Sequence, residues 1–195
     1  MGQAPAELAA SPLAWILALV VIQRLGELAL ARANTRRLLA QGGREVGRGH
    51  YPLFILLHAS WLIAIAAATP LDKQPVWALI GVFFVLQGLR VWVIATLGRY
   101  WTTRIITIDS APLVRGGPFR FVRHPNYWVV TGEIAVLPLA FGAWEVALIW
   151  SILNALLLRH RIAGVVVPGE APDVDVELLG RAEVGQVVEH VVVEA

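Results

Sequence analysis

The sequence predicts an all-α fold, a polytopic bundle of about five transmembrane helices followed by an irregular C-terminal tail. Of its 195 residues, 57% are hydrophobic and only 15% are charged, which is far more apolar than an ordinary water-soluble domain. Apolar runs recur at lengths near the roughly 20 residues that a helix needs to cross a bilayer. Arginines gather between alternate runs, as they do in cytoplasmic loops.

The first three spans follow from these runs and from the residues that bound them. Ser11 and Pro12 are typical of a helix start, an N-cap followed by a first-turn proline, so we expect the first span over residues 12–31. The second covers residues 51–69 and ends at TPLDKQP, a turn rich in helix breakers. The third covers residues 76–97.

The last apolar run, residues 127–159, is too long for a single crossing. Pro138 and Gly142 lie near its middle, in PLAFGAW, and proline disrupts a helix interior. The run therefore predicts two helices joined by a tight turn, which brings the number of spans to five. We expect residues 1–162 to form one membrane domain and residues 163–195 a separate, poorly ordered tail.

Charge placement predicts the orientation of these spans. Residues 32–50 and residues 98–126 each contain five arginines, whereas the turn at 71–75 has one Asp and one Lys. Because the excess of Lys and Arg marks cytoplasmic loops, we expect the N-terminus outside and the C-terminus inside. The first residues lack the basic region of a secretory signal, so the first run is expected to be a retained span.

The chain has no cysteine, which excludes a disulfide framework, a thiolate nucleophile and a cysteine metal site. The partner expected from this composition is the lipid bilayer. Neither nucleic acid nor a metal ion is expected to bind. The predicted location is a membrane.

Polar side chains inside the spans predict a single polar layer, about 8 to 12 Å from the cytoplasmic helix ends. Such side chains are costly in hydrocarbon unless they are paired or hydrated. One interpretation is the floor of a cavity that opens toward the cytoplasm. The other is a set of paired residues that only lock helix packing. The members of the layer are Arg24, Glu27, His58, Gln87, Arg90, Glu133 and Asn154.

The segment RGGPFRFVRHPNYW, residues 115–128, concentrates cations, prolines and aromatic rings beside an apolar run. Its arginines alone would be ordinary markers of a cytoplasmic loop. Their order indicates more, because GGPFR favours a turn and Pro125 biases His124 away from helical geometry. Irregular backbone at membrane depth is tolerated where it is buried in protein or lines a wet cavity. The segment therefore predicts a ligand site.

Residues 97–162, with GPFRFVRHPNY at their centre, resemble the bacterial isoprenylcysteine carboxyl methyltransferase-like membrane proteins, and residues 24–58 are also similar to them. The resemblance implies a small helical bundle that receives S-adenosylmethionine from the cytosol and a lipophilic acceptor from the bilayer. It also implies a location in the inner (plasma) membrane of a bacterium and a cofactor-binding segment. The matching residues are Gly117, Pro118, Arg120, Arg123, His124, Pro125 and Tyr127.

The resemblance leaves the methyl acceptor open between two classes. A carboxylate of the isoprenylcysteine type is already ionised and would need only a cation, with Arg104 or Arg90 as candidates. An alkylpyrone or alkylresorcinol hydroxyl would need proton removal, with His124 or Glu133 as the candidate base. The catalytic candidates are thus Arg104, His124 and Glu133.

Relatives usually carry an adjacent pair of glutamates after the last span, and this chain lacks the pair. Residues 163–195 hold eleven valines and no aromatic residue, an abrupt change that fits a reading-frame change near Ala163 or a divergent tail. Two further interpretations stay open. Membrane sterol and steroid reductases, which use NADPH, carry a similar RHPNY stretch, and the chain could also be a catalytically inactive membrane relative.

Overall fold

A computed structural model describes residues 11–46, 51–108, 114, 116–122 and 124–165 of the chain. Within them it forms five α-helices, two short strands and two single turns of 3-10 helix. The helices are α2 (Pro12–Ala40), α3 (Tyr51–Ala68), α4 (Trp77–Leu97), α5 (Pro125–Ala140) and α6 (Trp144–Val165). The strands are β1 (Arg44–Val46) and β2 (Ile105–Thr107), and the 3-10 turns are η1 (Gly98–Tyr100) and η2 (Gly117–Arg120).

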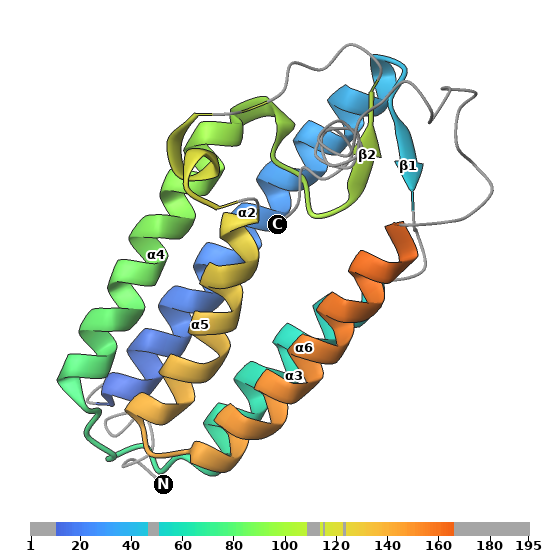
Figure 1. Ribbon diagram of the computed structural model, residues 1–195. Coiled ribbons are helices and arrows are strands. Elements are labelled where there is room, and N and C mark those ends of the chain that lie inside the picture. Colours follow the sequence, from blue (N-terminus) through green and yellow to red (C-terminus); the bar gives the residue numbers. More distant parts are fainter. Residues whose placement is uncertain (1–10, 47–50, 109–113, 115, 123, 166–195) are drawn as a thin grey trace, which may run out of the picture.

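The helices run roughly along one common direction (Figure 1). Helix α5 packs against both α4 and α6, and α3 runs beside α6. Side chains of α2 bond to α4 and α5. Both strands and both 3-10 turns lie at the end of the bundle where α4 finishes and α5 begins. We call this the loop end. The predicted helical bundle is therefore confirmed, and the GPFRFVRHPNY segment lies at one end of it.

Three helices are long and apolar enough to cross a membrane, namely α2, α3 and α4, the last counted together with η1. The chain is therefore an integral membrane protein. Helix α5 has 16 residues, which at 1.5 Å per residue gives about 24 Å. The arrangement of α5 and α6 as two further spans stays a prediction, as does the orientation of the bundle.

Helix α2 ends at Ala40, nine residues beyond the predicted end of the first span. No helix breaker interrupts ARANTRRLLA, and the helix stops only before Gly42, which adopts a φ of +91°. The buried amide of Asn34 donates to the carbonyls of Gly98 and Trp101, at 3.0 and 2.9 Å. The end of α2 is thereby fastened to the turn that follows α4.

The prediction of an all-α chain missed a small β-ribbon at the loop end. Strands β1 and β2 pair antiparallel, with Glu45 opposite Ile106. Each strand has three residues, too few for an alternating pattern to stand out in the sequence. The ribbon joins the two arginine-rich connections, which are about 60 residues apart in the chain.

The opposite end of the bundle is closed by short hydrogen bonds. The Ser11 hydroxyl caps α2 by accepting from the Ala14 amide at 3.3 Å, as predicted, and donates to the Leu71 carbonyl at 2.5 Å. The amide of Val76 donates to the carbonyl of Ala140 at 2.7 Å. These bonds place the start of α2, the α3–α4 turn and the α5–α6 turn side by side.

The predicted hairpin around Pro138 and Gly142 is confirmed. Helix α5 ends at Ala140, and Gly142 makes the turn with a φ of +78°. Helix α6 then continues through Val165, three residues past the domain boundary predicted at residue 162. The predicted tail beyond it, residues 166–195, lies outside the described residues.

The apolar core is built in two clusters. The larger draws on all five helices and includes Trp61, Phe83 and Leu137, each 1% exposed or less. The smaller lies at the loop end and consists of Ala31, Val93, Leu97 and Trp101, with Phe119 of η2 packed against it. The second cluster connects the GPFRFVRHPNY segment to α2 and α4.

Candidate functional site

The GPFRFVRHPNY segment folds as a 3-10 turn followed by the start of α5. The amide of Phe119 donates to the carbonyl of Gly116 at 3.2 Å, which closes η2. His124 then has φ −125° and ψ 70°, outside the helical region, and Pro125 begins α5. Proline favours this first helical position because it lacks the N–H that would be unpaired there. The predicted turn and the non-helical His124 are both confirmed.

Gly117 holds η2 tightly against α4. Its φ is +57°, and a Cβ added there would run into the side chain of Thr96, with Cγ2 at 3.0 Å and Cβ at 3.2 Å. Pro118 is buried beside it. A residue with a side chain would be strained by the positive φ and would also push the turn away from the helix. Glycine is therefore required by geometry at this position.

The rings of His124 and Tyr127 stack on each other at the head of α5. Their centroids are 5.2 Å apart and their planes meet at 22°. The irregular backbone at His124 and the first turn of the helix bring the two rings together, three residues apart. Both residues are partly buried. They form a flat aromatic surface within the segment.

Asn126 lies between these two ring residues and is buried, with 3% of its surface exposed. Neither its amide nitrogen nor its amide oxygen has a hydrogen-bond partner among the described residues. A buried amide without partners costs about 1 to 3 kcal/mol for each unsatisfied group. The sequence gives no signal for Asn126, whose unsatisfied amide becomes visible only in the folded chain.

The two arginines of the segment have different standing. Arg120 is exposed, and its guanidinium lies over the ring of Phe121 at 5.2 Å from the centroid. Arg123 lies outside the described residues. The predicted cofactor-binding residues Gly117, Pro118 and Arg120 thus form η2, while His124, Pro125 and Tyr127 form the start of α5.

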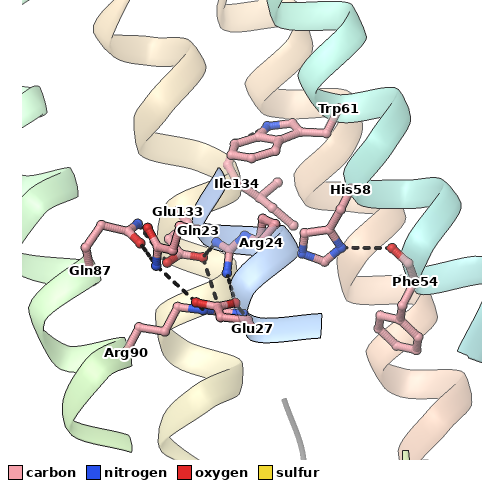
Figure 2. Close-up of polar contacts among 10 residues, drawn as sticks. All are labelled: Gln23, Arg24, Glu27, Phe54, His58, Trp61, Gln87, Arg90, Glu133 and Ile134. Atoms are coloured by element: carbon pink, nitrogen blue, oxygen red, sulfur yellow. Dashed lines mark hydrogen bonds and ion pairs between the residues drawn. The ribbon is translucent and has the colours of Figure 1, made fainter. Parts of the chain in front are cut away.

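A second polar cluster lies deeper in the bundle and joins α2, α4 and α5 (Figure 2). Its centre is an ion pair in which the Arg90 Nε and Nη2 atoms donate to the two carboxylate oxygens of Glu27, each at 2.7 Å. Arg24 donates to Glu27 at 2.8 Å and to Glu133 at 2.6 Å. The members, which we call the ion network, are Gln23, Arg24, Glu27, Gln87, Arg90 and Glu133.

Both carboxylate oxygens of Glu133 are occupied. Its Oε1 accepts from Gln87 at 2.8 Å, and its Oε2 accepts from Arg24 and, at 3.4 Å, from Arg90. Glu133 is 1% exposed and Arg90 is 5% exposed. Two arginines and two glutamates balance one another, which lowers the cost of burying them. Of the two interpretations of the polar layer, these bonds support the one in which pairing locks the helices together.

Gly132 permits the close approach that the ion network needs. A Cβ on this residue would lie 2.9 Å from a methyl group of Leu86 on α4. Small residues let membrane helices pack closely. Glu133, the next residue, can therefore reach Gln87 and Arg90 across the α4–α5 interface.

The two other predicted members of the polar layer bond elsewhere. The Nδ1 atom of His58 lies 2.9 Å from the carbonyl of Phe54 on its own helix, and its ring points toward Arg24 (Figure 2). The Asn154 amide donates to the Thr131 hydroxyl at 3.2 Å. The layer predicted from the sequence is thus one network of six residues, which includes the unpredicted Gln23, with His58 beside it.

Arg104, a predicted catalytic residue, belongs to the β-ribbon. Its Nη1 atom donates to both carboxylate oxygens of Glu45, at 3.1 and 3.0 Å, and its guanidinium lies over the ring of Tyr51. The side chain of Glu45 is 5% exposed and that of Arg104 is 40% exposed. The three predicted catalytic residues therefore lie in three settings, namely the ribbon for Arg104, the head of α5 for His124 and the ion network for Glu133.

No group of three or more His, Cys, Asp or Glu side chains that could hold a metal ion occurs in the part of the chain that the structure describes. The polar groups described above include the paired arginines and glutamates, the ring stack and the amide of Asn126.

Comparison with known proteins places these features in a family. The model of the isoprenylcysteine carboxyl methyltransferase (ICMT) family matches residues 79–164, which include η2, α5 and the ring stack. The uncharacterized protein YpbQ of Bacillus subtilis is 38% identical over 153 residues, 76% of this chain and 91% of that protein. An uncharacterized protein of Haemophilus influenzae is 26% identical over 152 residues, 74% of this chain and 87% of its own. No solved structure matches. The chain belongs to the isoprenylcysteine carboxyl methyltransferase family.

Proposed function

We propose that the chain is an S-adenosylmethionine-dependent O-methyltransferase of the membrane, acting on a lipophilic acceptor. Membership of the family implies a membrane methyltransferase. The observation that carries the proposal is the stacked His124–Tyr127 pair at the head of α5, beside a buried amide that lacks a partner. These groups belong to the segment whose resemblance implies the cofactor site.

The residues of this segment fit the chemistry of S-adenosylmethionine. Its sulfonium is attracted to aromatic faces, and the stacked rings of His124 and Tyr127 offer one. Its carboxylate suits arginine, and we assign Arg120 and Arg123 to it. Gly117 and Pro118 shape η2, and Pro125 directs the chain into α5. The unsatisfied amide of Asn126 requires a polar partner.

Bound S-adenosylmethionine would supply a methyl group on a positively charged sulfur, open to attack by an oxygen nucleophile. The task of the chain is alignment, which contributes several kcal/mol when reacting groups are held in place. The Thr96–Gly117 contact fixes η2 on α4, and the Asn34 bonds fix the end of α2. The residues of the site are therefore held on a rigid support.

Between the two acceptor classes, we favour the hydroxyl of an alkylpyrone- or alkylresorcinol-type lipid. Arg90 is already bonded to Glu27, and Arg104 to Glu45. A carboxylate of the isoprenylcysteine type would have to share one of these guanidinium groups with a glutamate or displace it. For a hydroxyl acceptor, we propose His124 as the group that takes the proton. Glu133, with both oxygens engaged, is proposed as a positioning residue.

We propose that the loop end faces the cytoplasm of a bacterial inner membrane, since the two arginine-rich connections meet there. S-adenosylmethionine is a water-soluble cosubstrate and would reach the site from that side. The acceptor would arrive through the bilayer that surrounds the apolar helices.

The experiment is a transfer assay with S-[methyl-³H]adenosylmethionine, the purified protein in lipid vesicles, and alkylresorcinol or a prenylated cysteine as the acceptor. Tritium should enter the organic phase in an acceptor-dependent way. A methyl ester is hydrolysed by mild alkali and a phenol ether is not, so alkali treatment separates the two classes. Absence of transfer to either acceptor, together with absence of S-adenosylhomocysteine binding, would overturn the proposal.

A matched pair of histidine variants tests the site. His124→Ala should weaken S-adenosylhomocysteine binding in isothermal titration. His58→Ala, which removes a ring that bonds only its own helix among the described residues, should leave it unchanged. Binding of NADPH in place of S-adenosylhomocysteine would support the reductase interpretation.

A further inference from the structure

We propose that Asn126 binds the adenine edge of the methyl donor, through one hydrogen bond given and one accepted. The inference rests on the proposed function, because it takes S-adenosylmethionine as the ligand. It adds a residue that the resemblance did not assign and a reason for base specificity.

Asn126 is a buried polar residue without hydrogen-bond partners among the described residues. The residue is 3% exposed, yet both ends of its amide lack a partner among the described residues. Buried polar groups in proteins are bonded in the great majority of cases. Asn154 differs in part, since it is fully buried and its amide nitrogen donates to the Thr131 hydroxyl, while its amide oxygen also has no partner among the described residues. Within the described part of the chain, Asn126 is therefore the buried asparagine with both a donor and an acceptor left to offer.

Asn126 lies on the buried face of α5, at the end of the helix near the stacked rings. Asn126, Val130 and Glu133 are all buried and are spaced four and three residues apart, so they share one face of the helix. Glu133 marks where that face meets the ion network. Seven residues correspond to about 10 Å along the helix axis. Asn126 thus lies nearer the loop end than the paired charges, level with the stacked rings of His124 and Tyr127.

The donor and the acceptor of the Asn126 amide indicate which group of S-adenosylmethionine it binds. A primary amide presents a donor and an acceptor side by side in one plane. Adenine offers the complementary pair, an exocyclic N–H donor next to a ring-nitrogen acceptor, and asparagine is a common bidentate partner for it. The carboxylate of S-adenosylmethionine can only accept hydrogen bonds, and its ammonium group can only donate them. The neutral, planar adenine edge satisfies both ends of Asn126 at once.

The test compares two ligands on three proteins, all as the full chain purified in detergent. The ligands are S-adenosylhomocysteine and its 6-deamino analogue, in which purine replaces adenine and the exocyclic donor is lost. The proteins are the unmodified chain, Asn126→Leu and the matched control Asn154→Leu. In the unmodified chain the analogue should bind about tenfold more weakly, as expected for one lost hydrogen bond to a buried partner.

Asn126→Leu should bind S-adenosylhomocysteine at least about tenfold more weakly and should no longer distinguish the two ligands. Asn154→Leu should keep the ratio of the unmodified chain. If Asn126→Leu keeps that ratio, the inference is wrong while the proposed function stands. If the unmodified chain binds neither ligand, the proposed function itself fails. Asn126→Ala, judged by the same ratio, replaces the leucine variant should the latter fail to fold.

Discussion

The indole N–H of Trp61 on α3 donates to the main-chain carbonyl of Ile134 on α5, 3.2 Å away. Ile134 lies four residues before Pro138, which is inside the helix and has no N–H to offer. The carbonyl that the proline leaves without a helical partner is thus bonded by a neighbouring helix. This is how a proline is accommodated inside a membrane bundle.

Replacing Trp61 by Phe should lower the free energy of unfolding by about 1 to 2 kcal/mol, because the buried carbonyl of Ile134 loses its donor. In a Pro138→Ala background, the new N–H at position 138 can bond to the same carbonyl, so the penalty of Trp61→Phe should shrink. Equilibrium unfolding in mixed micelles measures both penalties. Equal penalties in the two backgrounds would show that the loss comes from packing of the indole alone.

The ion network should behave as one unit. Arg90→Met should destabilise the fold by about 3 kcal/mol or more, since it leaves Glu27 and Glu133 buried with fewer partners. Adding Glu27→Met removes one of those uncompensated charges, so the double variant should be more stable than the sum of the single effects predicts. A double-mutant cycle on unfolding free energies measures the coupling. Additive effects would contradict a closed network.

The helical spans and the polar layer could be predicted because the bilayer constrains the sequence directly. An apolar run must be long enough to cross, and a charge within it must find a partner, so Arg24, Glu27 and Glu133 stood out. Their mutual bonds are in the structure. Gln23 escaped notice because an amide one position away from a charge gives no distinct signal.

The ribbon and the end of α2 could not be predicted in the same way. A three-residue strand such as β1 has no period, and its partner lies about 60 residues away. The end of α2 is also held by Asn34, whose amide bonds to a turn that only the folded chain brings near. In the GPFRFVRHPNY segment, the motif predicted the non-helical backbone at His124. The unsatisfied amide of Asn126 is visible only once the burial of that residue is known.

Gly117→Ala should impair ligand binding more than folding. The new Cβ meets Thr96 and the φ of +57° disfavours a side chain, so η2 must shift away from α4. S-adenosylhomocysteine affinity, measured by titration, should fall by about tenfold or more, on the scale of 1 to 2 kcal/mol of backbone strain. Gly116→Ala is the matched control, since its Cβ would meet nothing within 4 Å. Similar losses in the two variants would show that the Thr96 contact is unimportant.

Single cysteines can establish the orientation of the bundle, since the natural chain has none. Gln41 follows α2 at the loop end, and Asp72 lies in the α3–α4 turn at the opposite end, and both are exposed. With the arginine-rich end inside, a membrane-impermeant maleimide added to intact cells should label Asp72→Cys and spare Gln41→Cys. Permeabilised cells should give labelling of both, which confirms that each thiol is accessible. Labelling of Gln41→Cys alone in intact cells would reverse the predicted orientation and place the stacked rings of His124 and Tyr127 on the side away from the cytosol, against the proposed use of a cytosolic methyl donor.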